Sequence, residues 1–173
     1  MKLKKIYMEV CEGKPVDISQ LRAELDAVMK ELQEDVEVEE EEAELLEDAE
    51  HKLKDVDMLE DFEKTLGTDG VTTAAQNKEL MREITQIMRD LAKDPKLDPI
   101  KVNKRSLRAK GLSPATIDEE IKLKHIYDEI AAGKPVDVAH LRAELDDVMY
   151  EMEQDAKREK EEAALLQNTD VIA

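Results

Sequence analysis

The sequence predicts an all-α protein made of elongated helical hairpins or a helical bundle, with one internal duplication. Three observations predict it. Strong helix formers such as Ala, Leu, Glu, Lys and Met dominate a chain of 173 residues that holds only 5 Gly and 5 Pro. Aromatic residues make up 2% of the chain, so thin layers of aliphatic side chains between helices are expected in place of a thick core. The third observation is a repeat with helical spacing.

The repeat appears when the sequence is compared with itself at an offset of 120 residues. Residues 2–48 match residues 122–168 at 27 of 47 positions without a gap. The segment Gly13-Lys14-Pro15-Val16-Asp17, for example, returns as residues 133–137. This is an internal duplication.

Each copy is predicted to fold as helix, turn and helix. Leu3, Ile6, Tyr7 and Val10 are spaced as one stripe of an α-helix. The glycine-proline turn ends that helix, and Asp17 is a good N-cap for the next one. The second helix carries apolar residues at alternating spacings of three and four, a seam suited to helix pairing. The seam comprises Ile18, Leu21, Leu25, Val28 and Leu32 in the first copy, and Val138, Leu141, Leu145, Val148 and Met152 in the second.

Helical patterns continue between the copies. One runs to Gly67, a second starts at the Thr73–Gln76 capping box, and a third restarts at Ser113-Pro114. Residues 87–98 align without a gap to residues 6–17, with Asp98 at the cap position. This segment is either a degenerate third copy or an ordinary capped helical hairpin.

These boundaries divide the chain into three predicted parts. Residues 1–50 form the first hairpin with an acidic arm, residues 51–113 a central helical segment, and residues 114–173 the second hairpin.

The charge of the chain is strongly uneven. Net charge is −18, and residues 34–50 hold eleven acids and no base, densest at Glu39, Glu40, Glu41 and Glu42. This run is interpreted as a solvated helical arm or as an electrostatic docking strip for a partner. Lys101, Lys104, Arg105, Arg108 and Lys110 form the one basic window. They are candidates for contact with phosphates or with acidic partner proteins, the latter favoured in so acidic a chain.

The region around this window carries a resemblance to a known family. Its residues are Asp94-Pro95, Asp98-Pro99, Val102-Asn103, Arg105, Leu107 and Gly111-Leu112. The stretch resembles segments of podophage small terminase subunits, although the internal duplication is not part of that family's pattern. The resemblance implies a helical, ring-forming, non-catalytic oligomer that recognises viral DNA for packaging, with residues 101–110 as the DNA contact.

No catalytic, cofactor-binding or metal-binding constellation is predicted. His51, His125 and His140 lie far apart in sequence and in no zinc spacing, and no glycine-rich phosphate loop occurs. Cys11 is matched by Ala131, as expected for a packing position. One cysteine favours a reducing compartment, the cytoplasm, or a virion if the chain is viral. No long apolar run is present, so neither a signal peptide nor a membrane span is predicted.

The expected function is therefore that of a non-enzymatic assembly or adaptor protein acting through helix–helix contacts with itself or with partner proteins, a viral scaffold among the candidates. Two alternatives remain open: a small-terminase-like DNA-packaging subunit and an acidic DNA mimic that inhibits a DNA-binding protein.

Overall fold

The computed structural model describes residues 2–13 and 15–172. Met1, Lys14 and Ala173, which fall within the predicted parts 1–50 and 114–173, lie outside the described residues. Two compact units divide the chain: Met1–Leu45 with Glu162–Ala173, and Leu46–Glu161. The second unit therefore combines the predicted central segment with most of the second hairpin.

The all-α prediction is confirmed. The helices are α1 (Lys2–Cys11), α2 (Ile18–Thr65), α3 (Ala74–Ala92), the 3₁₀ turn η1 (Pro99–Lys101), α4 (Lys104–Ala109), α5 (Pro114–Ala131) and α6 (Val138–Ile172). Within the described residues, the β structure consists of one isolated antiparallel bridge between Val71 and Asp137. None of the described helices is both long enough and apolar enough to cross a membrane.

The helix boundaries follow the capping signals of the sequence. Thr73 and Gln76 form a reciprocal capping box at the start of α3, and Ser113 caps α5 with Pro114 at the first helical position. Asp17 accepts a hydrogen bond from the backbone N–H of Ser19 at the start of α2. Gly13 has φ +70° and supplies the left-handed backbone that ends α1.

The basic window, residues 101–110, is not one continuous helix but is divided between η1 and α4. Asp98 caps η1, and the chain then extends through Val102 and Asn103. Asn103 opens α4 as a new N-cap, because its side chain accepts a hydrogen bond from the N–H of Ser106 at 2.8 Å. After Asp98, the segment aligned as a third copy therefore continues in two short helices, not in a long hairpin arm.

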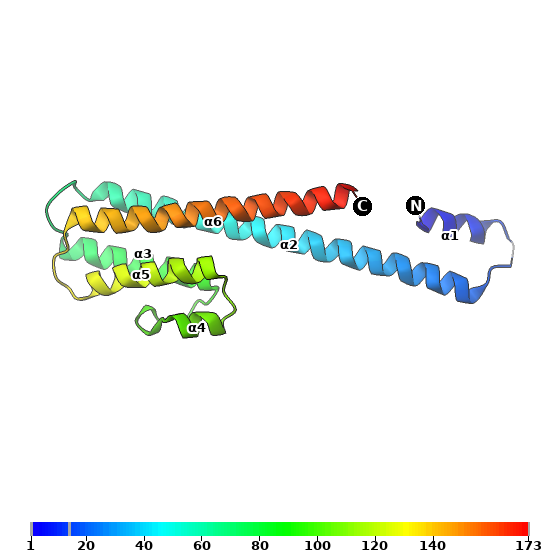
Figure 1. The fold of residues 1–173 in the computed structure, drawn as a ribbon, viewed down its shortest axis with the longest axis horizontal. Helices are drawn as coiled ribbons and strands as arrows, with labels where there is room; N and C mark the ends of the chain where they lie inside the picture. Colours follow the sequence, from blue (N-terminus) through cyan, green and yellow to red (C-terminus); the bar gives the residue numbers. More distant parts are fainter. Residues whose placement is uncertain (1, 14, 173) are drawn as a thin grey trace. The chain divides into compact units, whose positions relative to one another are not determined.

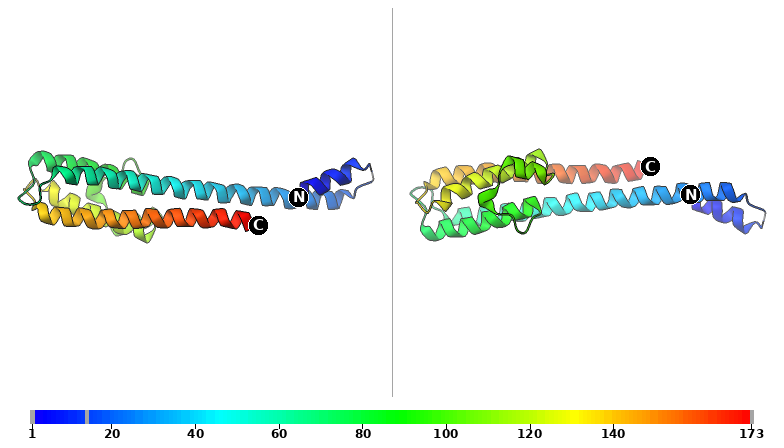
Figure 2. Two further views of the ribbon diagram at one scale, coloured as in Figure 1. Left: turned by 90° about the horizontal axis from the view of Figure 1, so that it is seen from above. Right: turned by 90° about the horizontal axis from the view of Figure 1, so that it is seen from below.

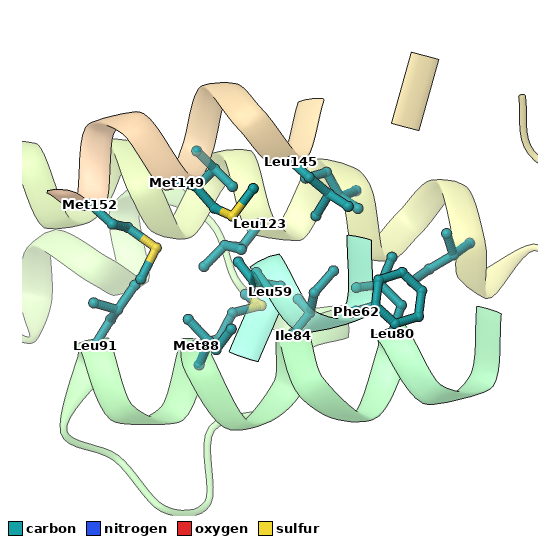
Figure 3. Close-up of a cluster of buried hydrophobic side chains, with 14 of the residues drawn as sticks. Leu59, Phe62, Leu80, Ile84, Met88, Leu91, Leu123, Leu145, Met149 and Met152 are labelled. Carbon is teal, nitrogen blue, oxygen red and sulfur yellow. The ribbon is translucent and has the colours of Figure 1, made fainter. Parts of the chain in front are cut away.

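The unit Leu46–Glu161 is a four-helix bundle. It consists of the C-terminal part of α2, then α3, α5 and the first part of α6, each antiparallel to the next, with α4 in the connection between α3 and α5 (Figures 1 and 2). The core draws side chains from all four helices (Figure 3). Leu59 and Phe62 come from α2, Ile84 and Met88 from α3, Leu123 from α5, and Leu145 and Met152 from α6; each is at most 2% exposed.

The two loops at one end of this bundle are hydrogen-bonded to each other. Thr72 donates its backbone N–H to the carbonyl of Val136 at 2.9 Å, and Val138 donates to the carbonyl of Gly70 at 2.9 Å. The Asn77 side chain donates to the carbonyl of Lys134 at 3.2 Å. The turn of the second hairpin is thus fixed to the loop between α2 and α3.

Candidate protein-docking surface

The first hairpin, formed by α1 and the start of α2, exposes an apolar face. On α2 this face follows one helical stripe, because its residues are three, four or seven positions apart. The exposed fractions are 69% for Ile18, 38% for Leu25, 65% for Met29, 53% for Leu32 and 51% for Val36. On α1, Leu3, Tyr7 and Val10 are 55%, 70% and 55% exposed. These eight residues are called the first-hairpin face below.

The hairpin closes on itself with only a few buried side chains. Ile6 of α1 and Val28 of α2 are 8% and 7% exposed, and Leu21 is half-buried. Of the predicted seam of the first copy, Val28 alone is therefore buried. The seam residues lie on a helix with the predicted spacing. A pair of helices, however, buries only the side chains that lie between the two helices.

The second hairpin buries the equivalent positions except Tyr127, the counterpart of Tyr7, which is half-buried. The α2 positions of the first-hairpin face correspond to Val138, Leu145, Met149, Met152 and Ala156, which are between 0% and 6% exposed. Leu3 and Val10 correspond to Leu123 and Ile130, both fully buried. The difference arises because α5 and α6 pack against α2 and α3 within the bundle, as Figure 3 shows for Leu123, Leu145 and Met152. A matching sequence pattern is thus buried in one hairpin and exposed in the other.

Charge does not oppose association of the first hairpin. Residues 2–33 hold six acids and six bases, whereas the eleven acids of the arm lie beyond them, in residues 34–50. Glu39, Glu40 and Glu41 are exposed on α2 and Glu42 is half-buried. The arm is therefore a charged helix surface next to a neutral apolar one.

The basic residues lie on η1, on α4 and just after it, and all five are exposed. Lys110 Nζ pairs with Asp94 Oδ2 at 2.6 Å, and this hydrogen bond holds the pKa of Asp94 below its ordinary value. Lys101, Lys104, Arg105 and Arg108 make no ion pair with the part of the chain that the structure describes. The basic window and the first-hairpin face are separate surfaces of the molecule, in different units.

Buried charges inside the bundle form a second set of residues that sequence reasoning missed. Lys52 Nζ donates to Asp155 Oδ2 at 2.8 Å and also to Glu159, and both carboxylates lie on α6. Burial raises the pKa of Glu119 to about 9, with Asp155 nearby adding to the shift, and burial raises the pKa of Glu120 to about 8. Burial, reinforced by Asp90, raises the pKa of Asp55 to about 8. These groups lie within the packed bundle, where a buried charge costs free energy unless a partner compensates it.

One cluster on the α5–α6 hairpin has the residue types of a metal site. His125, Glu129 and Glu144 place their ligand atoms within 4.8 Å of one another, and His140 lies beside both glutamates. Burial, together with the neighbouring Glu129, raises the pKa of Glu144 to about 7. The sequence alone predicts no metal ligands here, because the histidines fit no zinc spacing. Two His-x-x-x-Glu pairs on the two arms of a predicted hairpin are the signal that identifies the cluster.

Comparison of this chain with protein-family models, with curated proteins and with solved structures finds no match.

Proposed function

We propose that this chain is a non-enzymatic assembly protein that associates through the first-hairpin face. The occupant of that face is the same face of a second copy of the chain. Two first hairpins then supply four helices, the number that the bundle in Leu46–Glu161 uses to bury the equivalent positions.

The observation that carries the proposal is the contrast between the two copies. Leu25 is 38% exposed and Leu145, its counterpart, is 0% exposed, and Met29 and Met149 differ as 65% and 6%. A contiguous exposed apolar surface on a monomer marks an interaction site. In the second copy, packing against other helices of the bundle covers the equivalent surface, so helix packing is the expected way to cover the first-hairpin face.

Self-association is favoured over an unrelated partner for two reasons. Oligomers of one chain commonly use a two-fold interface in which the same patch meets itself. In a chain of net charge −18, the segment 2–33 is the region where two copies meet without net repulsion, since its acids and bases are equal in number. The acidic arm, in contrast, repels its copy and favours an arrangement in which the acidic turns beyond Val36 stay apart in the two chains.

The nucleic-acid alternative has weaker support. Its residues are exposed, but they lie on a three-residue 3₁₀ turn, a six-residue helix and the connecting backbone, not on one continuous helix that enters a groove. The surrounding charge of −18 also opposes approach to phosphates.

The test is the mass of the purified chain in solution by light scattering after size exclusion, at low and high salt. We expect a dimer at both salt concentrations, because apolar burial rather than ion pairing holds it together. Leu25→Glu combined with Leu32→Glu should yield a monomer, since it places two charges in the first-hairpin face.

The matched control is Ala23→Glu combined with Ala27→Glu. Both alanines are exposed, and by helical periodicity they lie on the opposite side of α2 from Leu25 and Leu32. The control adds the same charge to the same helix and should remain dimeric. A monomer for the unmodified chain, or equal dissociation by both double variants, would overturn the proposal.

A further inference from the structure

The second hairpin carries two pairs of possible metal ligands on facing helices. His125 and Glu129 are four residues apart on α5, and His140 and Glu144 are four residues apart on α6. Residues four apart lie on the same face of a helix. The turn at residues 132–137 makes α5 and α6 antiparallel neighbours (Figure 1). The two pairs contact each other through His125 with Glu144 and His140 with Glu129.

The distances across the cluster are short and similar. His125 Nε2 lies 3.0 Å from Glu129 Oε1 and 3.6 Å from Glu144 Oε2. His140 Nε2 lies 2.8 Å from Glu144 Oε1 and 3.5 Å from Glu129 Oε1. In a tetrahedral site with metal–ligand bonds of about 2.0–2.1 Å, neighbouring ligand atoms are about 3.3 Å apart. The four distances bracket this value, although His125 and His140 approach different oxygens of Glu144. Ligand atoms of His125, Glu129 and Glu144 all lie within 4.8 Å of one another.

The carboxylates are the more buried half of the cluster. The side chains of Glu129 and Glu144 are 24% and 17% exposed, whereas those of His125 and His140 are 69% and 57% exposed. Glu129 Oε2 is buried and accepts no hydrogen bond from the described residues, whereas Glu144 Oε1 has His140 Nε2 as its neighbour at 2.8 Å. Two adjacent, largely buried carboxylates are costly for a fold unless a positive charge joins them.

The duplication shows which residues of the cluster are shared by both hairpins and which are specific to the second. The equivalent residues of the first copy are Lys5, Glu9, Gln20 and Glu24. Both glutamates are therefore common to the two hairpins, and both histidines are specific to the second. Two of the 3 histidines of the chain thus lie in this one cluster.

We propose that His125, Glu129 and Glu144 bind one divalent transition-metal ion, with Zn²⁺ the ion that fits best, and that His140 lies beside this site. Zinc accepts imidazole nitrogen and carboxylate oxygen in a four-coordinate site. Mg²⁺ and Ca²⁺ prefer oxygen ligands throughout, so an imidazole ligand selects against them. The three ligands come from both helices, so the ion joins α5 to α6 close to their connecting turn.

The experiment is isothermal titration of the full chain with zinc chloride, with magnesium chloride as the comparison. We expect one zinc ion per chain and no comparable binding of magnesium. The test variant combines His125→Lys with His140→Gln, which gives the second hairpin the residues of the first. It should weaken zinc binding by more than the roughly 10–100-fold that loss of a single outer-shell partner causes.

Two controls make the result specific. His51→Gln removes the remaining histidine, which lies on α2 beside Glu47, and should leave zinc affinity unchanged. Cobalt(II), used as a spectroscopic substitute, should give the intense visible absorption of a tetrahedral site in the unmodified chain and lose it in the double variant. Equal zinc affinity in the unmodified chain and the double variant, or tighter binding of magnesium than of zinc, would overturn the proposal.

Discussion

At the scale of single residues, the bundle holds several carboxyl groups where water cannot solvate their charge. Glu119 and Glu120 are 1% and 0% exposed on α5, and neither carboxyl group receives a hydrogen bond from the described residues. Burial disfavours the charged form and raises the pKa of both. Lys52 differs, because its hydrogen bonds with Asp155 and Glu159 outweigh burial and hold its pKa above the ordinary value.

The raised pKa of Glu119 predicts a stability that falls as pH rises. Between its ordinary pKa of 4.5 and its folded value of about 9, the folded chain holds a proton that the unfolded chain has lost. This group therefore reduces the free energy of unfolding by up to about 1.4 kcal/mol for each pH unit in that window. Glu119→Gln, neutral at every pH, should lose less stability than the unmodified chain between about pH 5 and pH 9 in denaturant unfolding.

The control for this prediction is Asp118→Asn. Asp118 is the neighbouring residue on α5 and is exposed, so its substitution removes the same charge without touching the buried site. Its pH dependence should follow that of the unmodified chain. A Glu119→Gln profile parallel to that of Asp118→Asn would show that Glu119 ionises normally.

At the scale of helices, the duplication places matching stripes in two environments. Leu25 and Leu145 occupy the same position of the same helical pattern, yet only Leu145 meets side chains of α2, α3 and α5. The turns differ in the same way. Residues 133–137 are tied to the loop before α3 by hydrogen bonds at Val136 and Val138, whereas the backbone bonds recorded for the described part of residues 13–17 stay within the first hairpin.

This contrast predicts unequal costs for one substitution. Leu145→Ala removes a fully buried side chain and should lower the free energy of unfolding of the bundle by about 2–5 kcal/mol. Leu25→Ala should change it by less than about 0.5 kcal/mol, although it weakens the proposed dimer. Hydrogen exchange of the α3 amides measures the bundle alone, and equal loss of protection in the two variants would contradict the assigned environments.

At the scale of the whole molecule, charge is the dominant property. The chain holds 44 acidic and 26 basic residues, and its longest uncompensated run is residues 34–50 of α2. Like charges on successive turns of a helix repel and lower its stability. The second copy relieves this repulsion, because Lys157 and Lys160 stand where the first copy has Glu37 and Glu40.

The repulsion predicts that added salt stabilises the chain. The melting temperature, followed by far-ultraviolet circular dichroism, should rise as monovalent salt screens the acidic run. Glu37→Lys combined with Glu40→Lys, which copies the second hairpin, should reduce that rise. Glu153→Lys combined with Glu161→Lys changes the net charge equally outside the run and should reduce it less. An equal effect of the two variants would assign the salt response to net charge alone.

Local signals in the sequence specify the helices of this protein and their ends. Capping boxes, the glycine-proline turns and the spacing of Leu, Ile and Val specify helices through bonds and contacts between residues close in the chain, so α2, α3 and α5 begin where the pattern predicts. The sequence pattern does not predict the break at Asn103. An Asn side chain caps a new helix only where its own backbone is extended, and the pattern does not specify that backbone conformation.

The packing of helices in three dimensions determines which apolar helix faces are buried and which side chains contact each other. Two matching hairpins cannot be told apart by periodicity, since burial depends on whether other helices are near. The cluster of His125 with its neighbour His140 arises from packing between the consecutive helices α5 and α6, and the burial of Glu119 from packing of α5 within the bundle. For that reason the candidate docking face and the candidate metal site emerge only when the two copies are compared in three dimensions.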